Sequence, residues 1–258
     1  MAKGHKGHLG LGIVMLVSFF VVLFLIFSPI FPKTPEGSPQ NGLEFSDRMF
    51  NRLAKGSSYF IPKVMKSNEK FMGKMINVTI KMDKPADQPG DAEKRAELNS
   101  KLYGAIEGTR VEVKGPELKI EGDLGKILAS ALNDSDAMFN NEGDKIKAKY
   151  AGFMAMAGDD EKKIFRQWHN SFTKLDKELK KQKMIEEANM VSTVMKKAIE
   201  AAYNFYGIAP ERVSDRAGIM TGLLVFYVVY TLWYGFAIFY IFEGIGLSMK
   251  KAKVKKEV

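Results

Sequence analysis

The sequence has no cysteine and only three histidines among its 258 residues. The lack of cysteine excludes disulfide bonds, thiolate zinc sites, covalently attached c-type haem and cysteine nucleophiles. His5 and His8 lie in a short glycine-containing tail, and His169 stands alone beside Trp168, so few general bases or metal ligands are available. Neither a glycine-rich phosphate loop nor a GxSxG motif is present. The sequence therefore predicts no enzyme, no cofactor and no metal site.

Charged side chains are missing from two long stretches, Leu9–Pro32 and Ala217–Phe242. A helix that crosses a membrane needs about 20 apolar residues, and both stretches meet this length. The first stretch is longer than the apolar region of a cleaved signal peptide, about 7–15 residues, and "SPIFPKTP" after it offers no small-x-small cleavage site. We therefore predict two transmembrane helices, over residues 9–31 and 217–247.

Lysines flank these two stretches. The tails, residues 1–8 and 248–258, are rich in lysine, and lysines beside short tails mark the cytoplasmic side of a membrane. Both termini are therefore predicted to be cytoplasmic, with the intervening chain exported. The tails also suit anionic lipid and account for much of the net charge of +9, so this charge does not indicate nucleic acid. The residues that carry the prediction are Lys3, Lys6, Lys250, Lys251, Lys253, Lys255 and Lys256.

The region between the two spans begins with a proline- and glycine-rich spacer, residues 32–42, which breaks any helix that leaves the membrane. Residues 43–216 follow and are predicted to form an α-rich exported domain. A region of this length can bury its own core without disulfide bonds. The lack of cysteine argues against the disulfide-dense ectodomain of a eukaryotic surface receptor, and the simplest interpretation is a bacterial inner-membrane protein that faces the periplasm.

A change of apolar period marks a predicted β-hairpin over Thr109–Leu124. Apolar and polar residues alternate in "TRVEVKG" and "ELKIEGDL", and "KGPE" separates the two runs. Asp123 is predicted to cap the helix that follows. For Phe60–Lys81 the pattern leaves helix and strand open, because "MINVTIKM" is rich in β-branched residues.

The longest predicted helical region is Asp160–Tyr206, which contains neither glycine nor proline. Its apolar residues follow a coiled-coil-like spacing of 4, 3 and 4 from Trp168 to Leu179. Charged residues interrupt this seam over "KKQKMIEE". Either one continuous helix or two antiparallel helices fits the pattern.

The second apolar stretch is unusually rich in tyrosine. Tyr227, Tyr230 and Tyr234 recur at i, i+3 and i+7 and share one face of the predicted helix. They are either interfacial or self-bonded residues, or they pack against another membrane helix, in which case a hydroxyl in the hydrocarbon region finds a hydrogen-bond partner. Gly218 and Gly222 form a small-xxx-small pattern that favours close helix approach. Glu243 is expected at the headgroup level, paired with a lysine, with a proton-relay role as the alternative.

The predicted fold class is a membrane protein with two transmembrane helices flanking an α-rich (α+β) exported domain with one small β-hairpin and a long helix. The favoured function is that of a non-catalytic accessory or scaffold subunit of a bacterial inner-membrane assembly. Its second span would dock on partner membrane helices, and its exported domain would hold a periplasmic protein. The alternatives are a sensor-like regulator that relays ligand binding through the second span, and a small homo-oligomeric channel.

Overall fold

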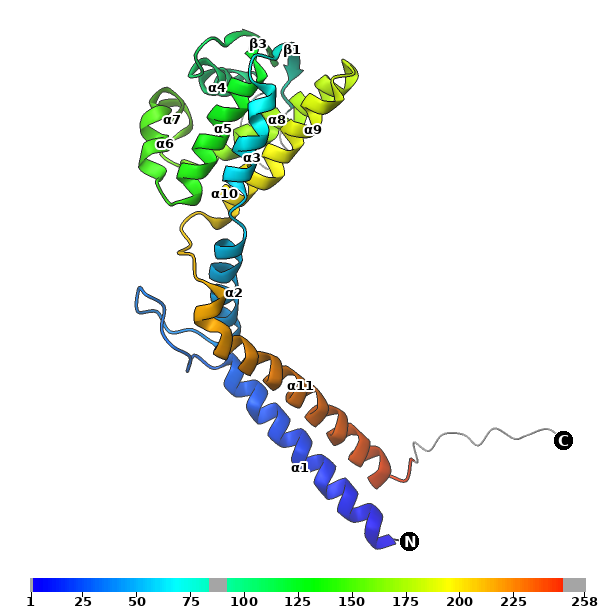
Figure 1. Ribbon diagram of the computed structural model, residues 1–258. Coiled ribbons are helices and arrows are strands. Elements are labelled where there is room, and N and C mark those ends of the chain that lie inside the picture. The colour runs from blue at the N-terminus through cyan, green and yellow to red at the C-terminus, as the bar shows by residue number, and fades with distance from the viewer. Residues whose placement is uncertain (1, 84–91, 248–258) are drawn as a thin grey trace, which may run out of the picture. The chain divides into compact units, whose positions relative to one another are not determined.

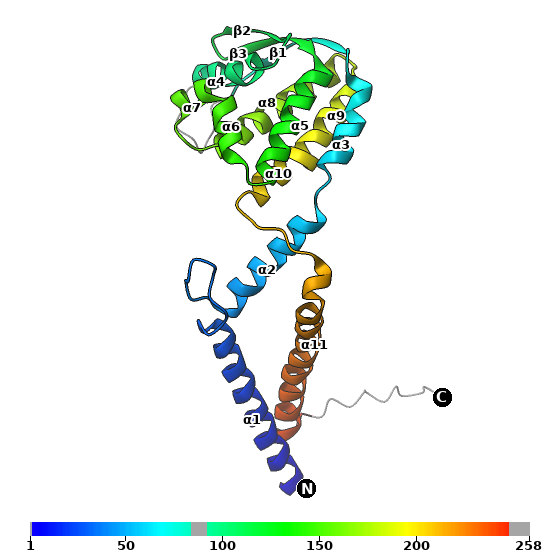
Figure 2. The same ribbon diagram turned by 60° about the vertical axis from the view of Figure 1, so that its left-hand side comes forward.

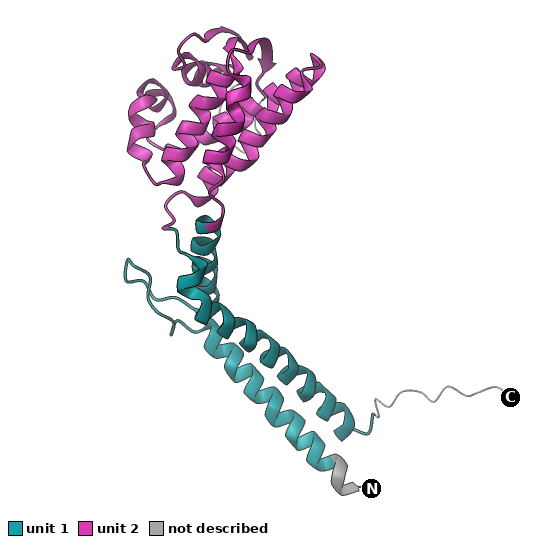
Figure 3. Ribbon diagram, viewed as in Figure 1, with its two compact units in different colours: residues 1–56, 210–258 teal, residues 57–209 magenta. Residues whose placement is uncertain are grey.

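The computed structural model describes residues 2–83 and 92–247 (Figure 1). The chain divides into two compact units, coloured separately in Figure 3. Residues 1–56 and 210–258 form the first, here called the helix-pair unit, and residues 57–209 form the second, the globular unit. The structure is mostly helical with one small sheet.

Two long apolar helices, α1 (Ala2–Phe27) and α11 (Val213–Gly244), lie side by side in the helix-pair unit (Figure 1). Both are long and apolar enough to cross a membrane. Helix α1 ends two residues before Pro29, because proline disfavours helical conformation in the residue before it and lacks a backbone donor. Helix α11 begins four residues before the predicted 217–247, because no proline or glycine occurs between Pro210 and that position to stop it.

The helix-pair unit also contains nearly all of α2 (Gly42–Ser57), a helix that begins at the last residue of the predicted spacer and continues into the predicted domain 43–216. Its start is a reciprocal cap, in which Asn41 Oδ1 accepts from the Glu44 N–H and Glu44 Oε2 accepts from the Asn41 N–H, both at 2.9 Å. Near its end, Arg52 lies 2.9 Å from Glu211, whose carboxylate also accepts two hydrogen bonds from Arg216. These contacts join the end of α2 to the start of α11.

The sheet of the globular unit has three antiparallel strands in the order β1-β3-β2. The predicted hairpin is confirmed as β2 (Arg110–Lys114) and β3 (Glu117–Asp123), joined at Gly115, whose φ of +58° suits a two-residue hairpin turn. The prediction of a single hairpin is incomplete, because β1 (Met75–Lys81) pairs with β3 along its whole length. The strand is stable there because its alternate residues, Ile76, Val78 and Ile80, point into the core.

Helices cover the inner face of this sheet and enclose the core (Figure 2). Asp123 caps the helix after the hairpin as predicted, since its Oδ1 accepts from the Lys126 N–H at 3.3 Å. Trp168 is fully buried between the rings of Tyr103 and Phe172, with both centroids 5.2 Å away. The helical elements before the long region are α3 (Ile61–Asn68), η1 (Glu69–Phe71), α4 (Ala92–Gly104), α5 (Leu124–Phe139), α6 (Gly143–Lys149) and α7 (Ala151–Ala157).

The region Asp160–Tyr206 is broken, so the antiparallel alternative holds. Helix α8 (Lys162–Lys181) ends where charges interrupt the apolar seam, and Lys183 adopts a left-handed φ of +63°. The chain then returns along α8, since His169 faces Glu200 at 3.2 Å and Arg166 donates to the Tyr203 hydroxyl. The returning elements are α9 (Ile185–Val194), a π-helical turn η2 (Met195–Ile199) and α10 (Glu200–Phe205).

Candidate functional site: the apolar helix pair and the Asp134 cluster

Two glycines allow α1 and α11 to approach closely. A Cβ added to Gly12 would lie 2.7 Å from the backbone nitrogen of Ile241 and 3.0 Å from the carbonyl oxygen of Ala237. A Cβ added to Gly244 would lie 2.5 Å from the Cα of Leu9. Real Cβ atoms do not approach backbone this closely, so the helix–helix distance depends on glycine at both positions.

Aromatic side chains of α11 bond to the backbone of α1. The Tyr230 hydroxyl donates to the carbonyl oxygen of Phe19 at 3.3 Å, and its ring stacks on the Phe19 ring with centroids 4.2 Å apart. The Trp233 Nε1 donates to the carbonyl oxygen of Met15 at 3.1 Å. In an apolar surrounding these polar groups need partners, and the chain supplies them from its own first helix.

The predicted tyrosine face is therefore divided. Tyr230 and Tyr234 both face Phe19, with the Tyr234 ring centroid 5.0 Å away. Tyr227 is 68% exposed and lies away from α1. Glu243 pairs with His8 of α1 at 2.8 Å. Of the predicted topology residues, Lys6 is exposed, and the side chain of Lys3 is not described. The others lie outside the described residues: Lys250, Lys251, Lys253, Lys255 and Lys256.

Gly218 and Gly222 are not part of this helix contact, since an added Cβ at either would meet no atom within 4 Å. They begin a stripe along α11 with spacings of 4, 3, 4, 3 and 4, the pattern of a coiled-coil seam. Every member of the stripe is exposed. We call it the open seam, and it comprises Gly218, Gly222, Val225, Val229, Leu232 and Phe236.

A groove of about 440 Å³ adjoins the C-terminal half of the open seam. Val229, Leu232 and Phe236 line it from α11, and Met15 and Ser18 line it from α1. Side chains of both helices thus form a largely apolar surface at the end of the open seam opposite Gly218 and Gly222. The sequence prediction included only Gly218 and Gly222 of this seam. The 4-3 spacing of the other four residues is also present in the sequence, but the prediction placed the main helix contact on the tyrosine face instead.

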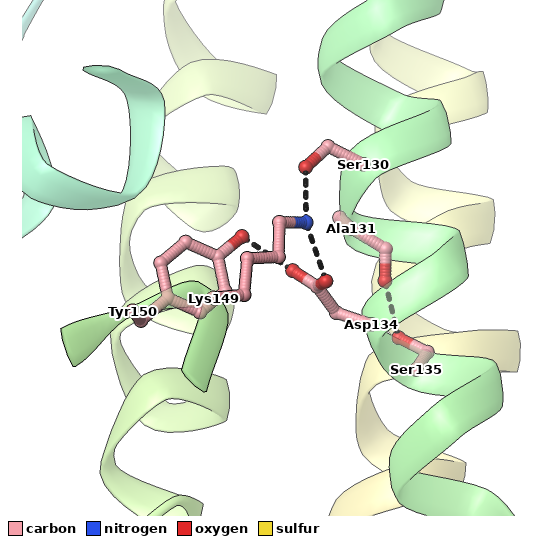
Figure 4. Close-up of polar contacts among 6 residues, drawn as sticks. All are labelled: Ser130, Ala131, Asp134, Ser135, Lys149 and Tyr150. Carbon is pink, nitrogen blue, oxygen red and sulfur yellow. Dashed lines mark hydrogen bonds and ion pairs between the residues drawn. The ribbon is translucent and has the colours of Figure 1, made fainter. Parts of the chain in front are cut away.

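A second cluster of functional groups surrounds Asp134 on α5 (Figure 4). Lys149 Nζ lies 2.6 Å from Asp134 Oδ1, and the Tyr150 hydroxyl donates to Asp134 Oδ2 at 2.5 Å. Lys149 also donates to the Ser130 hydroxyl at 2.9 Å. The indole nitrogen of Trp168 lies beside these groups without a well-formed hydrogen bond. The cluster thereby ties α5 to the junction of α6 and α7.

Burial governs the protonation of this cluster. The Asp134 side chain is only 3% exposed, and loss of solvation raises the pKa of its carboxyl, although the charge and hydrogen bonds of Lys149 oppose that rise. Burial and the neighbouring carboxylate also raise the pKa of the Tyr150 hydroxyl. Tyr150 therefore stays protonated at neutral pH and serves as a hydrogen-bond donor. Removal of one partner from such a buried pair leaves the other charge uncompensated, so each group depends on the other for its place in the fold.

A cleft of about 480 Å³ lies beside the Asp134 cluster, between α4, β2 and α7. Lys149 and Tyr150 form one side, and Val111 and Lys101 are on the other elements that line it. Within residues 2–83 and 92–247, no three His, Asp or Glu side chains gather closely enough to hold a metal ion. No protein-family model, curated protein or solved structure matches this chain.

Proposed function

We propose that the protein is a non-catalytic accessory or scaffold subunit of a bacterial inner-membrane assembly. The observation that carries the proposal is the open seam of α11, which has coiled-coil spacing, two glycines at one end and exposed residues along its whole length. Helix α1 already satisfies Tyr230 and Trp233, so the helix pair is a preformed unit with one face left for a partner helix. The globular unit is the exported part, which holds a periplasmic protein.

The proposed topology places both termini in the cytoplasm and the globular unit in the periplasm, because the lysine-rich tails stay on the cytoplasmic side. A reporter fused after Val258 is expected to be active only as a cytoplasmic reporter. The same reporter inserted at Gln88 is expected to be active only as an exported one. A C-terminal reporter that is active outside would refute the periplasmic assignment.

A second prediction concerns the two glycines of the open seam. Replacing both Gly218 and Gly222 by leucine is expected to weaken association with the partner helix by about 1–2 kcal/mol, because close approach of two membrane helices depends on small residues. The measurement is quantitative co-purification and crosslinking from native membranes in mild detergent. Folding of the helix pair should not change, because neither glycine contacts α1.

Gly235 provides the matched control, since it lies on α11 outside the seam and an added Cβ there also meets nothing within 4 Å. Gly235→Leu is expected to co-purify with the same partners as the parent chain. If the Gly218→Leu, Gly222→Leu chain also retains every partner, the open seam is not the docking face. If the parent chain yields only copies of itself, the oligomeric channel becomes the better account.

The cleft beside the Asp134 cluster favours one second candidate, the sensor-like regulator. Its volume suits a small molecule, and Lys101 supplies positive charge for an anionic one. Binding there would act on α4 and on the junction of α6 and α7, which the Asp134 cluster connects to α5. Screening small carboxylates and phosphates for a thermal shift of the purified chain distinguishes this candidate from a scaffold, which should show none.

A further inference from the structure

The first helix of the globular unit carries a row of lysines on its outer side. Lys63, Lys66 and Lys70 recur at i, i+3 and i+7 across α3 and η1, and all three are exposed. Ile61 and Val64 on the opposite side are buried in the core. Packing of the apolar side of α3 therefore turns the three lysines directly towards solvent.

A π-helical turn places two more lysines beside this row. Lys196 and Lys197 are adjacent and exposed in η2, where the wider turn interrupts the regular helix between α9 and α10. Helix α3 packs against η2, and the two neighbouring elements α3 and α9 can be followed in Figure 2. The Lys197 ammonium lies 5.1 Å from the centre of the Phe60 ring, which is itself 45% exposed. We call these five residues, Lys63, Lys66, Lys70, Lys196 and Lys197, the basic face.

The five lysines of the basic face lie close together on packed elements and have no ion-pair partner in the described part of the chain. Among the described residues, none of the five lies within ion-pair distance of a carboxylate. The acidic neighbours along the chain are Glu69 in η1 and Glu200 at the start of α10, and Glu200 faces His169. Eight other lysines of the unit are paired with Asp or Glu, namely Lys74, Lys119, Lys145, Lys147, Lys149, Lys174, Lys180 and Lys181. The basic face thus concentrates positive charge that the chain does not neutralise.

We propose that the basic face, with Phe60 at its edge, binds an acidic face of an exported partner protein. Complementary charge across an interface steers association and sets orientation, and an exposed aromatic ring at its margin adds an apolar contact. An anionic lipid surface is the less suitable occupant, because a helix that lies on a bilayer inserts an apolar side, whereas Ile61 and Val64 of α3 are committed to the core. This inference rests on the proposed scaffold role and names the surface through which the exported unit acts.

The test uses the full-length chain in phosphatidylcholine nanodiscs and a labelled polyglutamate peptide as the acidic probe. Lys63→Glu, Lys66→Glu, Lys70→Glu in one chain is expected to weaken peptide binding about tenfold at low salt, since exposed ion pairs contribute a factor of about two to three each. Added salt should remove the difference. Circular dichroism should be unchanged, because all three side chains are exposed.

The matched control reverses Lys94, Lys114 and Lys126, which are also exposed and lie on α4, β2 and α5. The control should bind the peptide within about twofold of the parent, and equal losses in the two triple variants would reduce the effect to net charge and overturn the proposal. Vesicles containing phosphatidylglycerol form the last arm. If they bind the parent through the same lysines while the peptide does not, the occupant is lipid, and the proposal is wrong. Co-purification of a membrane partner through the open seam tests the scaffold role separately.

Discussion

Replacing Gly12 by leucine is expected to force α1 and α11 apart. A side chain at this position meets the backbone nitrogen of Ile241 at 2.7 Å and the carbonyl oxygen of Ala237 at 3.0 Å, and backbone atoms inside a helix cannot move aside. Separation also breaks the hydrogen bonds of Tyr230 and Trp233 to the α1 backbone. Interhelical hydrogen bonds of this kind contribute about 0.6–2 kcal/mol each, so the pair loses several contacts at once.

The measurement uses the absence of native cysteine. Ser18→Cys and Val229→Cys place two thiols on the same groove, where a short bismaleimide can join them. Gly12→Leu should reduce the intramolecular crosslink severalfold in native membranes. Gly10→Leu is the control, because a Cβ at Gly10 meets nothing within 4 Å. Equal crosslinking in the two chains would show that the close glycine contact does not hold the helices together.

Replacing Lys149 by methionine is expected to destabilise the globular unit by about 3 kcal/mol. The substitution keeps most of the side chain's apolar length but leaves the buried Asp134 carboxylate without its cation. The value lies at the low end for breaking a buried pair, because the Lys149 side chain is itself 34% exposed and partly screened by water. Chemical denaturation followed by circular dichroism measures the loss.

The destabilisation of the globular unit by Lys149→Met should increase as pH rises. The charge of Lys149 lowers the pKa of the Asp134 carboxyl, so its removal raises that pKa further above the value in the unfolded chain. A folded state with the higher pKa holds the proton more tightly, and its stability falls as pH rises above about 4, the unfolded value, through the folded pKa. The destabilisation by Lys149→Met should therefore be small in acid and full at neutral pH.

Lys145→Met is the control for this experiment. Lys145 pairs with Glu142 on the surface, where both side chains are largely exposed, at 70% and 43%. Its loss should cost less than about 0.5 kcal/mol and show little dependence on pH. If Lys149→Met behaves in the same way, the Asp134 cluster does not support the fold, and its place beside the cleft would need a functional explanation instead.

Several elements follow from local patterns in the chain. The two apolar helices can be predicted because an uncharged, apolar stretch of that length is typical of a membrane-spanning helix. The hairpin can be predicted because apolar and polar residues alternate on both sides of a glycine-proline turn. The cap at Asp123 is equally local, since it depends on one side chain and the next turn of helix. The break near Lys183 remained open in the sequence, because charges weaken a seam without requiring a turn.

Other features depend on residues that are distant along the chain. The pattern of Met75–Lys81 suits a helix or a strand, and only pairing with β3 makes it a strand. Asp134 gains its partners from a separate helix junction, which no spacing in the sequence indicates. The sequence by itself determined the two apolar helices, the absence of charge along each of them and the lysine-rich ends. The tertiary structure decided that α1 covers Tyr230 and Trp233 and leaves the open seam free, because a pattern defines the faces of a helix but does not name the neighbour that covers each one.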